Sequence, residues 1–192
     1  DHVRPLPDCL GHAEATTLPL VAMTAWYGLR DLARLEEGET VLIHSAAGGL
    51  GQAAVQVARA AGANVIATAG TEDKRRMLRE SGIEHVFDSR DLSWGEGVLR
   101  ATGGRGVDVV LNSLTGAAIG LGMRVLAEDG RFVEVGKKDI YQGRSLDLSE
   151  FRKGVSFAAV DLAGLMSRRP ERFARLFAQV WEQVCAGTLV PL

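Results

Sequence analysis

The stretch AAGGLG, five small residues and one leucine, is the pattern in this chain that is best suited to binding chemistry. It follows an apolar run, Thr40–Ser45, that is typical of a buried strand, and it leads into helical apolar spacing over Leu50–Ala61. In such a strand–turn–helix unit, free backbone N–H groups and the helix dipole favour a phosphate at the helix N-terminus. Larger side chains would block the close approach of that phosphate. We therefore predict a dinucleotide-binding turn made by Ala46, Ala47, Gly48, Gly49, Leu50 and Gly51.

Two glycines of this turn have separate expected tasks. The segment matches the G-x-G-x-x-G frame with Ala46 in the first position. Gly48 would let the backbone approach the phosphates, and Gly51 would let the helix pack closely on the strand. A plain tight turn is the alternative interpretation. The strand before the turn, and the helix and strand after it, favour the dinucleotide.

The second strand of the unit, Asn64–Ala69, bears on which dinucleotide is bound. NAD-binding sites usually carry Asp or Glu about 20 residues after the turn, where it holds the ribose 2′-OH. Here Ala69, Gly70 and Thr71 stand at that place, and Glu72 and Asp73 come later and are expected to cap the next helix. A 2′-phosphate needs cations and donors instead. We therefore predict NADPH, held by Thr71, Lys74 and Arg75, although these cations could also only solvate a helix face.

Strand-like and helical segments alternate along the whole chain. Several of the strand-like runs are almost entirely apolar, as expected where helices cover both faces of a sheet. Repeated β–α alternation favours a parallel, doubly wound sheet with right-handed crossovers. We therefore predict one α/β domain of the Rossmann type, a three-layer α-β-α arrangement with strands at Thr40–Ser45, Asn64–Ala69, His85–Ser89, Val107–Ser113, Gly130–Gly136 and Val155–Asp161. The expected helices are Leu50–Ala61, Glu72–Ser81, Ser93–Ala101 and Thr115–Ala127, with flanking helical segments at His12–Glu36 and Pro170–Ala186 and a loop or short helix over Lys138–Gly154.

Composition narrows the function classes. The 192 residues carry 22 basic and 24 acidic side chains, a net charge of -2, without a basic run, so nucleic acid and anionic membranes gain no support as partners. The apolar runs are shorter than the roughly 18–20 residues of a membrane span, and the first residues lack the apolar core of a signal peptide. Cys9 and Cys185 lie outside any metal-ligand spacing. No metal is predicted, and a reduced, cytoplasmic chain is favoured over a disulfide.

Several longer stretches carry a family resemblance, namely VAMTAWYGL, HSAAGGLGQAAVQVA, FDSRDLSW, GGRGVDVVLNSL and LAEDGRFVEVGKKDI. In this order they resemble the enoyl reductase domain of modular polyketide synthases and animal-type fatty acid synthases. Those domains belong to the medium-chain dehydrogenase/reductase superfamily, alongside zinc-free quinone oxidoreductases. The resemblance implies that NADPH reduces the double bond of an enoyl thioester carried on an acyl carrier protein.

The resemblance also implies catalytic residues. Lys137 follows the fifth predicted strand and matches a lysine proposed as the acid or electrostatic stabiliser, with Lys138 as the alternative. Asp161 matches an aspartate proposed to work with that lysine. The competing roles are contact with ribose or phosphate for Lys137 and helix capping for Asp161.

Further cofactor contacts are expected at both ends of the dinucleotide. Towards the nicotinamide they are Thr24, Asn112, Ser113, Leu114, Val135, Gly136, Phe157 and Ala158. Arg90 would line the adenine end, or else form a surface ion pair with Asp88 or Asp91. Trp26 and Tyr27 are expected in the core, and His44 is predicted to be a hydrogen-bonded core imidazole without a catalytic role.

Members of this family also have a GroES-like catalytic domain, which nothing here matches. We therefore expect the nucleotide-binding subdomain of a larger synthase, in contact with other domains of its parent and paired as a homodimer through the edge strand VSFAAVD. Two alternatives stay open. One is a quinone or carbonyl reductase of the same superfamily, and the other is an NADPH-binding module without activity.

Overall fold

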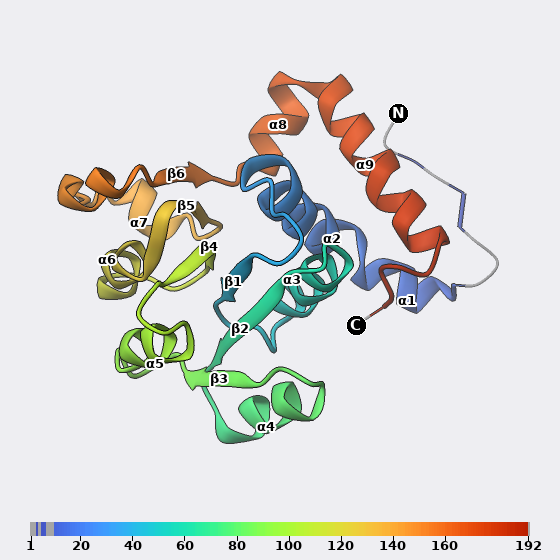
Figure 1. Ribbon diagram of the computed structural model, residues 1–192. Helices are drawn as coiled ribbons and strands as arrows, with labels where there is room; N and C mark the ends of the chain where they lie inside the picture. Colours follow the sequence, from blue (N-terminus) through green and yellow to red (C-terminus); the bar gives the residue numbers. More distant parts are fainter. Residues whose placement is uncertain (1–2, 4, 7–9, 192) are drawn as a thin grey trace.

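A six-stranded parallel sheet forms the centre of the molecule in this computed structural model, which describes residues 3, 5–6 and 10–191 (Figure 1). Neighbouring strands are parallel throughout and lie in the order β3-β2-β1-β4-β5-β6. The chain thus runs outward from β1 in both directions, and the predicted Rossmann-type fold is confirmed. The strands are β1 (Thr40–Ile43), β2 (Asn64–Ala69), β3 (His85–Asp88), β4 (Val107–Asn112), β5 (Leu126–Glu134) and β6 (Ser156–Ala159).

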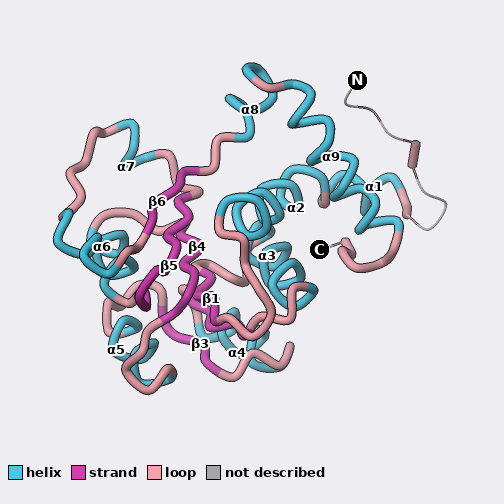
Figure 2. The backbone as a smooth tube through the Cα atoms, turned by 45° about the horizontal axis from the view of Figure 1, so that its top comes forward, coloured by secondary structure: helices cyan, strands magenta, loops and turns pink. Residues whose placement is uncertain are grey.

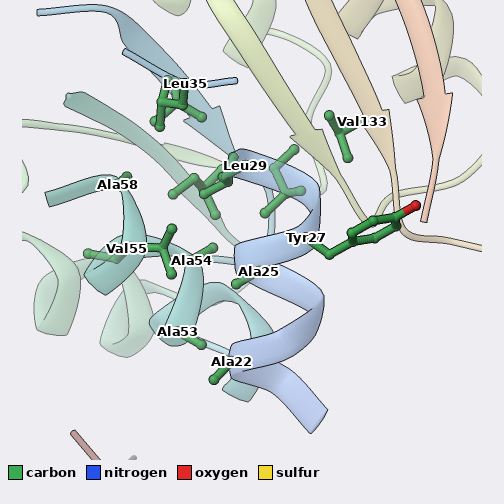
Figure 3. Close-up of a cluster of buried hydrophobic side chains, with 14 of the residues drawn as sticks. Ala22, Ala25, Tyr27, Leu29, Leu35, Ala53, Ala54, Val55, Ala58 and Val133 are labelled. Carbon is green, nitrogen blue, oxygen red and sulfur yellow. The ribbon is translucent and has the colours of Figure 1, made fainter. Parts of the chain in front are cut away.

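One face of the sheet is covered by helices from both halves of the chain (Figure 1). They are α2 (Pro19–Trp26), α3 (Gly49–Ala60), α4 (Glu72–Glu80) and α9 (Pro170–Cys185), with the short α1 (His12–Thr17) beside α2. Figure 3 shows Ala22 and Ala25 of α2 against Ala53 and Ala54 of α3. These alanines let the two helix backbones come close together, so α2 is packed tightly over the helix that follows the phosphate turn.

The opposite face is covered by α5 (Trp94–Ala101) and α6 (Ala117–Arg124), which lie on the other side of the strands from α2, α3 and α9 (Figure 2). Buried Trp94 and Phe132 are the largest side chains of this second core. Phe132 stacks on Phe157 of β6, with ring centroids 5.2 Å apart and an interplanar angle of 9°. This stacking ties the short edge strand to the body of the sheet.

The N-terminal helical segment is divided, whereas we predicted one stretch over His12–Glu36. After α1 the chain restarts as α2 with Pro19 in its first turn, and it continues as a π-helical segment, η1 (Tyr27–Leu32). Proline has no N–H to donate within a helix and is best accommodated in a first turn, so a new helix begins there. Tyr27 is buried and Trp26 packs against the core, as expected.

Other boundaries also differ from the prediction. The helix expected over Thr115–Ala127 ends at Arg124, because Leu126 pairs with Val107 of β4 and so begins β5. The segment between β5 and β6 holds two short helices, α7 (Lys138–Tyr141) and the 3-10 helix η2 (Leu148–Lys153). A helix that we did not predict, α8 (Leu162–Arg168), follows β6 directly.

No helix in the described part of the chain combines the length and the apolar character that crossing a membrane requires. Cys185 is an exposed free cysteine, and Cys9 lies outside the described residues, so the prediction about a disulfide stays untested.

Candidate functional site

The turn after β1 brings the N-terminus of α3 close to the strand. A Cβ at Gly51 would lie 2.4 Å from both the carbonyl oxygen of Ser45 and the Cα of Ala46. Ser45 has a positive φ of 53°, which directs the chain into the turn, and the Gly48 N–H donates to the Ser45 carbonyl at 2.9 Å. Close packing between helix and strand therefore leaves no room for a side chain at Gly51.

The first turn of α3 offers backbone donors to a ligand. The helical hydrogen bonds begin with the Gln52 N–H, which donates to the Gly48 carbonyl at 2.8 Å. The N–H groups of exposed Gly49 and half-buried Leu50 precede that bond and have no acceptor within the helix. Together with the helix dipole, they form the anion-binding end that the sequence predicts.

Ala46 does not face this ligand position, which corrects its predicted role. Its side chain is fully buried, and its N–H donates to the carbonyl of Thr68 at 2.9 Å. Half-buried Ala47 accepts from Gln52 Nε2 through its carbonyl at 3.2 Å. Buried Ala46 thus supports the turn from within the protein, while Gly49 is exposed at its outer side.

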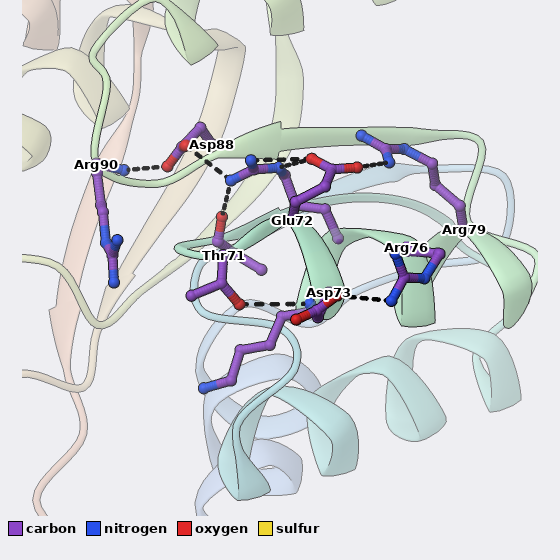
Figure 4. A network of polar contacts seen from close by, with 10 residues as sticks. Thr71, Glu72, Asp73, Arg76, Arg79, Asp88 and Arg90 are labelled. Atoms are coloured by element: carbon purple, nitrogen blue, oxygen red, sulfur yellow. Dashed lines mark hydrogen bonds and ion pairs between the residues drawn. The ribbon is translucent and has the colours of Figure 1, made fainter.

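At the carboxyl end of β2, Thr71 rather than Glu72 or Asp73 caps α4 (Figure 4). The Thr71 hydroxyl accepts from the Lys74 N–H at 3.4 Å, so its own hydrogen is still available to a ligand. Glu72 and Asp73 lie in the first turn and form ion pairs with arginines of their own helix. The expectation that these two carboxylates cap the helix is therefore wrong.

Arg75 is held away from the ligand side, which argues against its predicted contact with a 2′-phosphate. Its Nη1 lies 2.7 Å from Asp88 Oδ2 on β3 and donates to the Ala69 carbonyl at 3.1 Å, and its Nη2 lies 2.9 Å from Glu72 Oε2. Only 14% of the side chain is exposed. Among the described residues Lys74, by contrast, is exposed without an ion-pair partner.

Arg90 reaches back over the end of β2. A Cβ at Gly70 would lie 3.1 Å from Arg90 Nε, so the guanidinium crosses this glycine. Figure 4 shows the Arg90 side chain pointing away from Asp88. From Arg90, the Asp88 carboxylate accepts the backbone N–H, at 2.9 Å, and not the guanidinium. The alternative of a surface ion pair with Asp88 or Asp91 is thus not what the described residues form. Lys74 and Arg90 are the cations left for this end of the site.

The ends of β4 and β5 are joined by two buried polar side chains, Asn112 and Glu134. Asn112 Nδ2 donates to Glu134 Oε2 at 2.6 Å and to the Leu114 carbonyl at 2.8 Å, and its Oδ1 accepts from the Leu114 N–H at 3.2 Å. Every polar atom of this amide is therefore engaged within the protein. Asn112 supports the loop instead of touching the cofactor, which corrects its predicted role.

The residues next to Asn112 and Glu134 stay available on the two loops. Ser113 and Leu114 after β4, and Val135 and Gly136 after β5, are all half-buried. Ser113 Oγ donates to the His44 carbonyl at 3.4 Å, while the Gly136 N–H donates to Glu134 Oε1 at 2.6 Å. These loops lie at the carboxyl end of the sheet, where open α/β folds bind ligands.

Lys137 and Asp161 form a pair across the ends of β5 and β6. Lys137 Nζ donates to Asp161 Oδ1 at 2.7 Å, and 39% of each side chain is exposed. Asp161 also accepts from Arg168 Nη2 at 3.0 Å and, as the cap of α8, from the Gly164 N–H at 3.2 Å. The hydrogen bonds from Lys137, Arg168 and Gly164 hold the pKa of the Asp161 carboxyl far below its usual range. Both competing interpretations of Asp161, helix cap and partner of Lys137, thus hold together.

The remaining predicted contacts are placed as follows. Thr24 Oγ1 donates to the Leu20 carbonyl at 2.7 Å, so in this arrangement the hydroxyl can accept from a ligand but not donate to it. Phe157 and Ala158 are half-buried in β6, opposite Phe132 and Val133 of β5.

Two functional candidates were not found from the sequence, the buried carboxyls of Glu134 and Asp139. They line a cavity of about 700 Å³ beside α6, between apolar walls that include Phe157 and Leu146. Burial raises the pKa of Glu134 to about 7, despite the hydrogen bonds from Asn112 and Gly136. The available signal was a single acidic residue inside the apolar strand run RFVEV.

His44, at the end of β1, is a core residue as predicted, but only one of its ring nitrogens has a partner. Nδ1 lies 3.0 Å from Thr68 Oγ1, whereas Nε2 has no hydrogen-bond partner within the described structure. The ring packs edge-on against Trp94, with centroids 4.6 Å apart. Burial lowers the pKa of His44 to about 3, so the imidazole is neutral around pH 7.

Comparison with known proteins identifies the family to which this arrangement belongs. A family model described as zinc-binding dehydrogenase matches residues 49–182, from the phosphate turn to the last turn of α9. The chain belongs to the zinc-binding dehydrogenase family. In this member no three His, Cys, Asp or Glu side chains of the described residues group as metal ligands. The described residues therefore do not fit the zinc ion of the family name, and no step is assigned to a metal.

The relatives of this chain include much longer proteins. It is 53% identical over 184 residues to the phthioceranic/hydroxyphthioceranic acid synthase of Mycobacterium tuberculosis. The matched region is 96% of this chain but 9% of the synthase. A mycocerosic acid synthase-like polyketide synthase from the same species is 50% identical over 185 residues, again 96% of this chain and 9% of the relative. The chain thus spans a small part of the curated relatives that it matches.

Solved structures also match this chain. The CurK enoyl reductase superposes with a TM-score of 0.89 at 42% identity, over 98% of this chain and 56% of that one. The nucleotide-binding subdomain of the enoylreductase domain of PpsC from Mycobacterium tuberculosis gives a TM-score of 0.85 at 45% identity, over 91% of this chain and 97% of that one. The predicted relationship to the nucleotide-binding subdomain of polyketide synthase enoyl reductases is confirmed, and this fold implies a nicotinamide cofactor.

Proposed function

We propose that this chain is the NADPH-binding part of an enoyl reductase that reduces the α,β double bond of an enoyl thioester carried on an acyl carrier protein. The observation that carries the proposal is the contact between Lys137 and Asp161, 2.7 Å at the carboxyl end of the sheet. The close likeness to enoyl reductases supports it. Other domains of a parent synthase would supply the carrier protein and the rest of the substrate site.

The preference for NADPH over NADH rests on the charges at the end of β2. Lys74 and Arg90 are the cations that no carboxylate of the described residues neutralises there, and Thr71 retains a hydroxyl hydrogen. Glu72 and Asp73 are turned to arginines of α4. Such a surface attracts a 2′-phosphate and offers no carboxylate for a ribose 2′-OH. Exposed Gly49 and half-buried Leu50 would hold the diphosphate through their N–H groups.

When bound, NADPH supplies a hydride from C4 of its nicotinamide to Cβ of the enoyl thioester. The electron pair of the double bond then becomes an enolate, with negative charge on the thioester oxygen. In this proposal Lys137 Nζ stabilises that oxygen and holds a proton for Cα, and the hydrogen bond from Nζ to Asp161 supports an orienting role for the carboxylate. Addition of a proton at Cα completes the saturated thioester.

The test compares two neighbouring lysines in the parent polypeptide. Lys137→Met should lower kcat for reduction of an enoyl thioester by about 100-fold or more, because it removes both the charge and the proton at Nζ. Lys138→Met is the matched control, since Lys138 is exposed one residue further along and should leave the rate within a factor of about two. Equal rates for the two variants would contradict the role of Lys137. Reduction of quinones without any reduction of enoyl thioesters would overturn the proposed function itself.

We propose in addition that two copies pair through the outer edge of β6. This strand forms the edge of the sheet, and its residues Ser156 and Ala159 are exposed. An edge strand with unpaired backbone groups is able to add a strand from a second copy. Light scattering should then give twice the chain mass of 20.5 kDa. A monomeric mass across the concentration range would exclude the pairing.

A further inference from the structure

Glu134 connects the ends of three strands that lie far apart in the sequence. Its Oε2 accepts from Asn112 Nδ2 at the end of β4, and its Oε1 accepts from the Gly136 N–H one residue before Lys137, both at 2.6 Å. Its backbone carbonyl accepts from the Val160 N–H at 2.8 Å, next to Asp161. One residue thus holds the loop after β4, the loop after β5 and the end of β6.

The hydrogen bonds of Asn112 fix which of its side-chain atoms faces Glu134. The amide is oriented by Leu114, whose N–H donates to Oδ1 and whose carbonyl accepts from Nδ2. Nδ2 must therefore face Glu134, and both oxygens of Glu134 face donors. A carboxylate accepts from both donors. A protonated carboxyl or an amide in its place would direct a hydrogen of its own at one of these N–H groups.

We propose that Glu134 is a positioning residue for the reductase site, whose carboxylate fixes the loop after β4 and the loop after β5 that place the cofactor and Lys137. This inference rests on the proposed function, because it assigns those loops to NADPH and to the catalytic lysine. Glu134 is buried at 2% exposure and acts through Asn112 and Gly136.

The charged groups around Glu134 come from three segments that line the same cavity. Asp139 of α7 is also buried, where its Oδ2 accepts from the Gly116 N–H at 3.3 Å and its Oδ1 lies 2.6 Å from Arg144 Nε. Arg124 of α6 and Asp147, just before η2, complete the charged lining. The charge of Asp139, although paired with Arg144, still raises the pKa of Glu134, so the carboxylate of Glu134 relies on its hydrogen bonds to Asn112 and Gly136. Acidification towards pH 6 should protonate Glu134 and release the loops, since burial raises its pKa to about 7.

The test uses Glu134→Gln, with Glu128→Gln as its matched control on an exposed position of the same strand. Calorimetry of the 192-residue chain with NADPH is carried out at about pH 8 and about pH 6. We expect wild-type binding to weaken about fivefold on acidification beyond any change in the Gln variant. At pH 8 the Gln variant should bind about fivefold more weakly than wild type, because one donor has lost its acceptor. The Glu128 variant should behave as wild type at both values.

Amide hydrogen exchange provides a second readout that does not depend on the cofactor. The N–H groups of Gly136 and Leu114 should exchange faster in Glu134→Gln than in Glu128→Gln, while core strand amides keep their protection. Unchanged exchange together with an unchanged pH dependence of binding would overturn the role of Glu134. A wild-type chain that binds no NADPH would instead contradict the proposed cofactor, and the exchange result would still decide whether Glu134 holds the loops.

Discussion

Arg75 of α4 and Asp88 at the end of β3 form an ion pair, with 2.7 Å between Nη1 and Oδ2. This contact turns one arginine of the KRR run inward, to the wall between α4 and the sheet, and leaves the neighbouring Lys74 exposed. Two adjacent cations that look alike in the sequence therefore have different tasks. The consequence can be tested on cofactor choice and on stability.

Lys74→Ala should weaken NADPH binding about tenfold and leave NADH binding unchanged, because only the 2′-phosphate contacts this lysine in the proposed site. Arg75→Ala should instead lower the melting temperature, since it removes the ion pair with Asp88 and one of the two arginines that pair with Glu72. Calorimetry with both nucleotides and thermal unfolding of both variants check this division. Weaker NADPH binding in Arg75→Ala at unchanged stability would reverse the assignment.

The two central glycines of the turn should respond differently to alanine. Gly51→Ala places a Cβ 2.4 Å from the Ser45 carbonyl and should destabilise the chain by about 3 kcal/mol or more. At Gly48 the nearest atom to a new Cβ is 3.3 Å away and the φ of −86° suits any residue, so the fold should persist. There the methyl group would meet the phosphate, and NADPH affinity should fall roughly tenfold. Denaturant unfolding and calorimetry separate the two effects.

Two buried groups should give the stability of this chain opposing pH dependences. The pKa of His44 falls from 6.5 to about 3 on folding, so its contribution is fully present above pH 6.5 and is lost as the pH falls towards 3. The pKa of Glu134 rises from 4.5 to about 7, so its neutral form stabilises the fold below pH 4.5 and this contribution is lost as the pH rises to 7. Between pH 4.5 and 6.5 the two effects offset each other.

Single substitutions should separate the pH dependence due to His44 from that due to Glu134. His44→Gln should make the chain more stable on acidification from pH 6.5 to 4.5, because of these two buried groups only Glu134 then remains. Glu134→Gln should show the reverse, a loss approaching about 1.4 kcal/mol per pH unit for one proton. Urea unfolding at several pH values measures both slopes. Parallel slopes in the two variants would show that the burial of one of these groups is relieved in solution.

The two roles of Asp161 can be separated by chemistry. In Asp161→Asn one side-chain oxygen can still cap α8 at the Gly164 N–H, but the negative charge beside Lys137 is gone. Its melting temperature should stay near that of wild type, while kcat for the enoyl thioester in the parent polypeptide falls. Asp161→Ala removes both the helix cap and the negative charge, so its melting temperature and its kcat should both fall. Similar melting temperatures for the two variants would mean that the cap contributes little to stability.

The strands and the phosphate turn could be predicted because they depend on local properties of the chain. Apolar runs with helical spacing between them indicated four β–α units before any contact was known. The predicted boundaries of helices and strands were wrong where pairing with a residue far away in the chain decides them. Leu126 belongs to β5 because Val107 pairs with it, and nothing near Leu126 in the sequence indicates this.

The candidate site divides in the same way. The pair of Lys137 and Asp161 was expected from a resemblance, and their contact agrees with it. The misplaced contacts were Ala46, Arg75 and Asn112, whose types suit a ligand but whose polar atoms are used by Thr68, Asp88 and Glu134. Each of these partners lies 13 or more residues away in the chain, so no sequence spacing reveals them.

By itself, the sequence determined the parallel sheet, the glycine turn and the absence of an acidic residue at the end of β2. These follow from the periodicity of apolar residues and from the small size of glycine, which act over a few neighbouring residues. Only the tertiary structure decided which charges face a ligand and that Glu134 joins three strand ends. The physical reason is that a buried polar group must find its partners in space, and in a doubly wound sheet those partners come from strands far apart in the chain.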